Sequence, residues 1–275
     1  MMSLANDGVE IIASDFHPRP YAAALFDFDG TLSLLRRNWQ NVMIPQMVEV
    51  LTDTASGESQ ADLHGLVKEF VTRLTGKQTI YQMIRLAEEV EKRGATPLDP
   101  LEYKHEYLDR LWKQVGQNVE ACRSGHVPPD EMTVPGSHEL VQRLEDAGIP
   151  MYLASGTDEK YVLDEVAVLQ LNDYFGEHIY GALDDYKKFS KAMIIERLIQ
   201  EMGVPSEQLL GFGDGYVEIE EVKKVGGVAV GVASDEEGRA GIDQWKRHRL
   251  IDAGADLIVA DYRCLDTLWT TLGMD

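Results

Sequence analysis

Two carboxylates, Asp27 and Asp29, are the residues whose types and spacing most directly suggest chemistry. They lie in the segment LFDFDGT at 25–31, after an apolar run at 21–26 and before a glycine. They are therefore predicted to leave the C-terminal end of a buried strand. Most isolated Asp-x-Asp triplets are strand ends whose acids face water. The alternative is that Asp27 accepts a phosphoryl group as a nucleophile and Asp29 acts beside it as general acid and base. The motif alone leaves both interpretations open.

The composition narrows the class of protein and of partner. The chain has 275 residues, 44% apolar and 27% charged, which is typical of a globular protein with a substantial core. Its formal net charge of −21 argues against a nucleic-acid backbone or an anionic membrane surface as partner. No apolar run approaches the roughly 18 residues that a membrane span needs. An acidic protein can still bind a phosphate if a metal, a lysine and backbone N–H groups make the local potential positive.

The two cysteines, Cys122 and Cys264, form no CxxC motif or Cys/His cluster. Neither a disulfide framework nor a zinc site is therefore expected. The first residues, MMSLAND, lack a basic stretch followed by a long apolar run, so no signal peptide is expected. Together these features favour a cytoplasmic location, and the sequence leaves the oligomeric state unknown.

The periodicity of apolar residues divides the chain into three parts. Residues 1–20 show no period and are predicted to be a surface arm. From about 39 to 120, four runs have helical spacing with almost no strand signal, and Pro45 is expected to kink or shorten the first. This part is predicted to be a small helical bundle inserted into another domain. The expected helices are 39–53, 60–74, 78–93 and 100–119.

From about residue 130 onward, helices and strands alternate. Ser137 is expected to cap a helix that stops at Gly148. The alternation predicts an α/β fold, a Rossmann-like parallel sheet with helices on both faces and ligands at the C-terminal edge of its strands. The strand candidates in this part are 151–154, 179–182, 209–212, 228–232 and 257–259.

Two further groups at strand ends or helix starts suit a phosphate. Ser155 followed by Gly156 at a strand-to-helix turn can donate hydrogen bonds to a phosphate oxygen, although a serine there is usually only a helix cap. Lys191 lies in the first turn of an amphipathic helix, where the helix dipole disfavours a cation. A lysine there suggests an anionic partner, with Lys187 and Lys188 nearby as alternatives.

The fourth group of residues suits a metal ion. The predicted strand 209–212 runs into a Gly-Asp-Gly turn, which places Asp214 at the sheet edge and Glu218 one helical turn further on. Hard oxygen ligands of this kind suit Mg²⁺, which also takes a substrate phosphate oxygen. The turn is not a dinucleotide fingerprint, because Tyr216 stands where the third glycine is needed.

In this order, the four groups resemble the haloacid dehalogenase superfamily of phosphohydrolases. The resemblance covers about 20–36 and 130–235 and is strongest at 27–31 and 213–214. It implies a Rossmann-like catalytic core formed by residues 1–36 and 130–275. The helical insert, residues 37–129, then looks like the α-helical cap domain of this family.

By this resemblance, Asp27 attacks the phosphorus and forms an aspartyl-phosphate. Asp29 protonates the leaving alcohol and then activates the water that hydrolyses the intermediate. Mg²⁺ would be held by Asp27, the backbone carbonyl of Asp29 and Asp214. Where the family commonly has Asp, this chain has Glu218, which would bind the metal directly or stand behind its ligands.

The same resemblance assigns phosphate binding to Ser155, Gly156 and Lys191. Substrate selection is expected from the cap and from the segment after the catalytic loop, because the core recognises only a phosphate. Exposed arginines and an ordinary helix-helix turn are the alternatives for these segments. The candidate substrate contacts are Arg36, Thr75, Lys77 and Gln78.

The sequence therefore predicts a Mg²⁺-dependent phosphatase that acts on a small phosphorylated metabolite, with sugar phosphates as the expected class. A sugar phosphomutase is the alternative within enzymes, because it shares all four motifs. A non-catalytic module that binds such a metabolite is a third possibility, which the intact pair Asp27 and Asp29 disfavours. The basic run 246–249 is predicted to be a solvated helix face.

Overall fold

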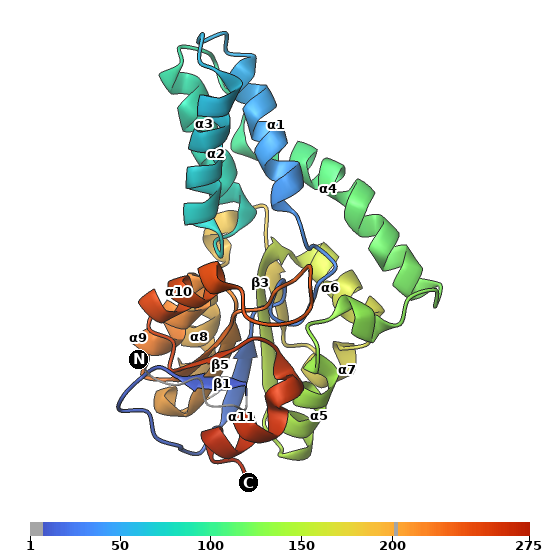
Figure 1. Ribbon diagram of the computed structural model, residues 1–275, viewed down its shortest axis with the longest axis vertical. Helices are drawn as coiled ribbons and strands as arrows, with labels where there is room; N and C mark the ends of the chain where they lie inside the picture. Colours follow the sequence, from blue (N-terminus) through green and yellow to red (C-terminus); the bar gives the residue numbers. More distant parts are fainter. Residues whose placement is uncertain (1–7, 201–202) are drawn as a thin grey trace. The chain divides into compact units, whose positions relative to one another are not determined.

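The computed structural model describes residues 8–200 and 203–275 (Figure 1). The chain divides into two compact units, one of Met1–Arg37 with Ala121–Asp275 and the other of Asn38–Glu120. In the described part of the chain, no helix has the length and hydrophobicity to span a membrane.

The larger unit contains a seven-stranded sheet in the order β1-β7-β6-β5-β2-β3-β4. All neighbouring strands from β7 to β4 run parallel, as the alternating pattern predicts. The strands are β1 (Val9–Ile11), β2 (Ala23–Phe26), β3 (Met151–Asp158), β4 (Ile179–Ala182), β5 (Leu209–Gly213), β6 (Val228–Val232) and β7 (Leu257–Val259).

Strand β1 corrects the prediction that residues 1–20 form only a surface arm. It pairs antiparallel with β7, with Val9 opposite Val259, so the sheet is mixed at this edge. Three residues are too few for a period of two to be recognised, and only Val9 among them is fully buried. Residues 1–7, which belong to the same prediction, lie outside the described residues.

Helices cover both faces of the sheet, as predicted (Figure 1). Ala23 and Leu25 of β2 join a buried cluster with residues of α8, α9 and α10. On the opposite face, Phe26 stacks on Phe212 with ring centroids 4.6 Å apart and meets Phe175 of α7 edge-on. The helices are α5 (Ser137–Asp146), α6 (Glu159–Val168), α7 (Asn172–Phe175), α8 (Lys191–Gln200), α9 (Tyr216–Lys224), α10 (Gln244–Asp252) and α11 (Leu265–Leu272), with short 3-10 turns at Pro129–Met132, Tyr186–Lys188, Ser206–Gln208 and Tyr262–Cys264.

The predicted ends of α5 are half right. The helix ends at Asp146, and Gly148 follows with a positive φ of 70°, a backbone conformation that glycine adopts easily. Ser137 is not the cap. It lies inside the first turn and donates its hydroxyl to the Val134 carbonyl at 2.7 Å, while Gly136 occupies the capping position.

The smaller unit is helical, and its helices begin and end within a few residues of the predicted bounds. Helix α1 continues through Pro45, so the expectation that this proline shortens it is wrong. Proline removes one N–H, and the buried residues Met43, Met47 and Leu51 secure α1 by packing. The helices are α1 (Gln40–Thr52), α2 (Gln60–Leu74), α3 (Thr79–Lys92) and α4 (Pro100–Arg123), the last of which ends in the larger unit.

Candidate active site

The strand order brings the predicted site residues to one edge of the sheet. β2 lies between β5 and β3, where the chain order reverses, and ligands of open α/β sheets bind outside such a point. Phe26, the last residue of β2, is in register with Phe212 of β5 and Leu153 of β3. The residues that follow these three positions therefore emerge side by side.

Asp27, Asp214 and Glu218 form an acidic group at this edge, with one carboxylate oxygen from each within 4.8 Å of the others. Two glycines make room for the group. A Cβ on Gly30 would lie 2.2 Å from Asp214 Oδ2, and one on Gly213 would lie 2.0 Å from Glu218 Cγ. Three hard oxygen donors this close together suit a divalent cation such as Mg²⁺.

Both carboxylate oxygens of Glu218 already have partners within the protein. Oε1 accepts a hydrogen bond from the backbone N–H of Gly215 at 2.6 Å, at the start of α9. Oε2 accepts from Lys191 Nζ at 2.8 Å. The extra methylene of glutamate, compared with aspartate, thus lets this side chain join the helix start to the lysine.

Lys191 is the lysine that faces the predicted nucleophile. Its ammonium lies 2.8 Å from Asp27 Oδ1 and its residue is only 5% exposed. Burial lowers the pKa of Lys191, but the attraction of Asp27 and Glu218 outweighs this and raises it. Lys187 is exposed, and Lys188 is largely exposed and pairs with Asp185 at 2.9 Å.

Burial raises the pKa of Asp27 well above its ordinary value, and the neighbouring carboxylates of Glu218 and Asp214 raise it further. Lys191 opposes this effect. Burial likewise raises the pKa of Asp214 to about 6. The edge therefore concentrates negative charge in a poorly hydrated place, which a bound cation would relieve.

Asp29 contacts hydroxyl groups from β3. Thr157 donates its hydroxyl to Asp29 Oδ2 at 2.8 Å, and Ser155 Oγ lies 3.5 Å from the same oxygen. Burial raises the pKa of Asp29, whereas Arg36 and Thr157 lower it. Thr157 was not among the predicted residues. Its signal was its place two residues after Ser155, because alternate residues of an extended strand share a face.

Arg36, a predicted substrate contact, is buried rather than exposed. Its guanidinium lies 4.0 Å from Asp29 Oδ1 and forms a two-pronged ion pair with Glu165, whose oxygens are 2.6–3.1 Å away. Its guanidinium carbon also lies 5.3 Å from the ring centre of Tyr161. Burial raises the pKa of Glu165 to about 7, although Arg36 lowers it. Glu165 was not predicted, and nothing in its local sequence marks it.

Lys246 corrects the prediction that the run 246–249 is a solvated helix face. Its ammonium lies 2.8 Å from Asp214 Oδ2 and 2.6 Å from Glu236 Oε1, and the residue is only 8% exposed. Arg247 of the same run pairs with Glu10 of β1. A run of basic residues looks the same in the sequence whether or not one of them is buried. Only the packing of α10 against β6 shows which residue is buried.

The remaining predicted substrate contacts lie in the smaller unit, between α2 and α3. Thr75 donates its hydroxyl to the Val71 carbonyl at 3.0 Å, Lys77 is exposed, and Gln78 is buried. The two units are described separately, so a role for these three residues at the sheet edge stays a prediction.

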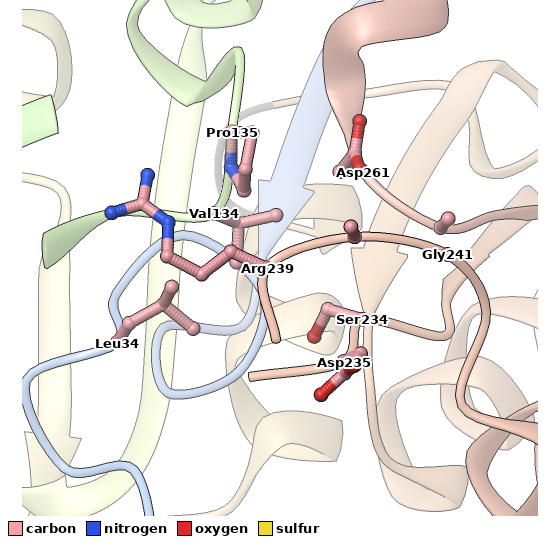
Figure 2. Close-up of a pocket in the computed structure, with 10 residues that line it drawn as sticks. Leu34, Val134, Pro135, Ser234, Asp235, Arg239, Gly241 and Asp261 are labelled. Carbon is pink, nitrogen blue, oxygen red and sulfur yellow. The ribbon is translucent and has the colours of Figure 1, made fainter. Parts of the chain in front are cut away.

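A small pocket lies beside the loop that joins β6 to α10 (Figure 2). Ser234 and Asp235, at the start of this loop, contribute to its lining, which does not include Asp27, Asp29 or Lys191. We therefore place the candidate active site at the sheet edge around Asp27 and not in this pocket.

The sheet order defines an α/β fold, with an acidic group at the edge of the sheet whose oxygens could hold a metal ion. Residues 21–226 match the family model for haloacid dehalogenase-like hydrolases, and the chain belongs to this family. A comparison with curated proteins gave no match.

Solved structures of low sequence identity share the fold. A predicted phosphatase from Clostridium acetobutylicum is 18% identical with a TM-score of 0.59, over 94% of this chain and 100% of that one. A β-phosphoglucomutase from Clostridium difficile is 14% identical with a TM-score of 0.59, over 92% and 98%. A HAD family hydrolase from Deinococcus radiodurans, solved with bound phosphate and sodium, is 16% identical with a TM-score of 0.54, over 93% and 97%.

Proposed function

We propose that this protein is a Mg²⁺-dependent phosphatase that hydrolyses a small phosphorylated metabolite, with sugar phosphates as the preferred class. The observation that carries the proposal is the contact of Lys191 with both Asp27 and Glu218, next to Asp214. This contact would bring the proposed carboxylate nucleophile, the proposed phosphate-binding cation and the proposed metal-ligand oxygens together. Membership of the hydrolase family supports the same reaction class.

The donor set fits Mg²⁺. Asp27 and Asp214 would supply carboxylate oxygens, together with the backbone carbonyl of Asp29. We assign Glu218 to holding Lys191, because both of its oxygens already accept hydrogen bonds. When bound, Mg²⁺ would offset the negative charge of the phosphoryl group as it is transferred.

Asp27 would attack the phosphorus, so that a carboxylate-oxygen-to-phosphorus bond forms as the bond to the leaving alcohol breaks. Asp29 would give its proton to the alcohol oxygen, a role that the burial-raised pKa of this carboxyl favours. Asp29 would then take a proton from water as this water attacks the phosphorus. Inorganic phosphate would leave, and the Asp27 carboxylate would be restored.

We assign binding of the phosphoryl oxygens to Ser155, Gly156 and Lys191. Ser155 is buried, and its hydroxyl accepts a hydrogen bond from the backbone N–H of Thr157 at 3.0 Å. Its own proton makes only a long contact, 3.5 Å, with Asp29 Oδ2, and would turn to a phosphate oxygen when substrate binds. Lys191 would also partly neutralise the carboxylates that face the substrate. In the helical unit, which we assign as the cap, Thr75, Lys77 and Gln78 remain the proposed substrate contacts.

The test is phosphate release from a panel of sugar phosphates, nucleotides and an aryl phosphate, with Mg²⁺ and with EDTA. We expect metal-dependent release by the wild type and none by Asp27→Asn, which should remain folded. The preferred panel member would name the substrate class. Activity retained in Asp27→Asn would remove Asp27 as the nucleophile.

Two variants separate the other roles. Asp29→Asn should be nearly as inactive as Asp27→Asn, and a mild effect would mean that another group moves the proton. Lys191→Ala should raise KM, because the cation beside the phosphate is lost. Lys188→Ala is the matched control and should leave KM unchanged, since Lys188 is largely exposed and pairs with Asp185.

A sugar phosphomutase is the second candidate, and the fold shared with a β-phosphoglucomutase favours it. It would pass the phosphoryl group from Asp27 back to a sugar instead of to water. Isomer formation from a sugar phosphate in the presence of a catalytic amount of sugar bisphosphate would favour it over the phosphatase. Tight binding of a sugar phosphate without any turnover would instead support a non-catalytic module. A cytoplasmic location, compatible with two free cysteines, completes the proposal.

A further inference from the structure

Lys246 is a buried cation that the proposed reaction does not use. Its ammonium contacts Asp214 Oδ2 at 2.8 Å, Glu236 Oε1 at 2.6 Å and Ser234 Oγ at 3.2 Å. Asp214 is one of the carboxylates that would hold the metal. A fixed positive charge therefore lies within hydrogen-bond distance of a carboxylate that is proposed to hold the metal.

The helix that carries Lys246 is anchored at its first turn. The carboxylate of Asp243 caps α10 and accepts hydrogen bonds from the backbone N–H groups of Trp245 and Lys246 at 2.8 and 3.0 Å. Ser234 donates its hydroxyl to the Gly30 carbonyl at 2.8 Å, next to Asp29. The ammonium is thus held in place by the backbone behind it.

The loop that carries Glu236 is also held. Arg239 donates to the carbonyl of Asp130 at 2.7 Å and to that of Glu131, and its side chain extends beside Val134 (Figure 2). Asp235 accepts hydrogen bonds from the backbone N–H groups of the loop at 2.9 and 3.2 Å. Both partners of the Lys246–Glu236 contact are therefore held in place by hydrogen bonds within the protein.

Charge explains why a cation is needed here. Burial of carboxylates without cations would be costly, and three buried side-chain cations lie among them. Lys246 is the member that contacts Asp214. The carboxylates are Asp27, Asp29, Glu165, Asp214, Glu218 and Glu236, and the cations are Arg36, Lys191 and Lys246.

We propose that Lys246 is a built-in competitor of the divalent cation, an ammonium that occupies the Asp214 and Glu236 carboxylates and thereby lowers the affinity of the site for Mg²⁺. The inference rests on the proposed function in taking Asp214 as a metal ligand. Mg²⁺ has to compete with the lysine for Asp214. The site therefore binds Mg²⁺ only at Mg²⁺ concentrations that are high enough to displace the lysine.

The opposite role makes the opposite prediction. If Lys246 served only to orient Asp214 as a ligand, its removal would misplace that carboxylate and weaken metal binding. Competition requires that its removal strengthen metal binding, because a positive charge 2.8 Å from a ligand oxygen disappears. The sign of the change therefore decides between the two roles.

The experiment is calorimetric titration of Mg²⁺ into the wild type, Lys246→Gln and Lys246→Met, without substrate. We expect both variants to bind Mg²⁺ on the order of tenfold more tightly than the wild type. Lys223→Met is the matched control, because it removes a lysine that pairs with a different buried carboxylate, Asp256, at 2.7 Å. It should bind Mg²⁺ as the wild type does.

Equal or weaker binding by the Lys246 variants would overturn the inference and leave the phosphatase proposal intact. If no protein, wild type or variant, bound Mg²⁺ at millimolar concentrations, both the inference and the metal site of the proposed function would fall. Tighter binding in the control as well would assign the effect to net charge and would also overturn the inference.

A second measurement uses the wild type and avoids any variant that fails to fold. Competition is reciprocal, so Mg²⁺ must weaken the hold of Asp214 on Lys246. We expect Mg²⁺ to increase acylation of Lys246 by an amine-reactive reagent, measured by mass spectrometry, relative to acylation of Lys223 in the same sample. Unchanged or decreased labelling of Lys246 would contradict competition.

Discussion

The hydroxyl of Thr157 and that of Ser155 approach the same oxygen of Asp29, yet they differ in strength of contact. Thr157 donates at 2.8 Å, whereas Ser155 lies at 3.5 Å. Thr157 is therefore the group that fixes the direction of the Asp29 carboxyl. A general acid must lie within hydrogen-bond reach of the oxygen that it protonates, so its orientation matters as much as its pKa.

Thr157→Val should lower kcat by about tenfold or more with a smaller effect on KM, because it frees the proposed acid without removing a phosphate ligand. The measurement is steady-state hydrolysis of an aryl phosphate. Thr157→Ser keeps the hydroxyl and should restore most of the rate. A valine variant with the kcat of the wild type would mean that Thr157 does not position Asp29.

Glu165 should make stability depend on pH. Burial raises the pKa of Glu165 from 4.5 to about 7 in the folded protein, so the folded state holds its proton more tightly than the unfolded chain does. Its stabilising contribution is complete below about pH 4.5 and is lost as the pH rises to about 7. The loss is on the order of a few kcal/mol.

Glu165→Gln cannot titrate and should lack this dependence. Urea unfolding of both proteins between pH 5 and 8 should therefore show the free energy of unfolding of the wild type falling relative to that of the variant as the pH rises. A constant difference across this range would show that the ion pair with Arg36 keeps Glu165 ionised throughout.

At the scale of elements, the periodicity of the sequence predicted the helices and strands that are determined by residues close together in the chain. Six strands and the four helices of the insert were found within a few residues of their predicted bounds, because their apolar patterns are long or clearly bounded by glycine. β1 was missed because its pairing with β7 is a contact between distant parts of the chain. β3 was predicted to end at Ala154, but it continues past a register shift to Asp158 and carries Thr157 to the site.

The candidate site, like the elements, was predictable only where local sequence patterns place its residues. Asp27, Asp214 and Lys191 follow strands or begin helices, and the topology alone brings such positions together. Lys246 and Glu165 approach them only through the packing of α10 and α6, which no local pattern encodes. A run of basic residues suggests a solvent-exposed helix face, and this inference fails for a residue of the run that is buried.

Strand β5, which precedes α9, should not tolerate a side chain at its last residue, Gly213. A Cβ on Gly213 of β5 would lie 2.0 Å from Glu218 Cγ, and Glu218 is fixed at both oxygens. Gly213→Ala should lower the free energy of unfolding by about 1–3 kcal/mol and reduce phosphatase activity, because Lys191 loses its support. Chemical denaturation and the aryl phosphate assay would measure the two effects.

Gly65→Ala is the matched control for this substitution. Gly65 lies within α2, where an added Cβ meets no atom within 4 Å. It should raise stability by up to about 1 kcal/mol, because alanine favours a helix over glycine. A Gly213→Ala protein as stable and active as the wild type would mean that α9 can shift to admit the methyl group.

At the scale of the whole molecule, the chain places its proposed chemistry in one unit and its proposed selectivity in the other. Every carboxylate and cation assigned to phosphoryl transfer belongs to the larger unit, while Thr75, Lys77 and Gln78 belong to the helical one. With a net charge of −21, the molecule repels phosphorylated substrates at long range. Exposed cations on the helical unit could therefore contribute to substrate capture.

Lys77 tests this division. It is exposed, so Lys77→Ala should leave thermal stability and Mg²⁺ affinity unchanged. It should raise KM several-fold for the preferred sugar phosphate but leave the rate with an aryl phosphate unaltered, because an aryl group lacks the hydroxyl groups that Lys77 would contact. Lys68→Ala, which removes an exposed lysine from α2, is the control for net charge. If Lys77→Ala and Lys68→Ala changed KM equally, the change would be due to long-range charge. If Lys77→Ala affected both substrates equally, Lys77 would be excluded as a residue that selects the metabolite.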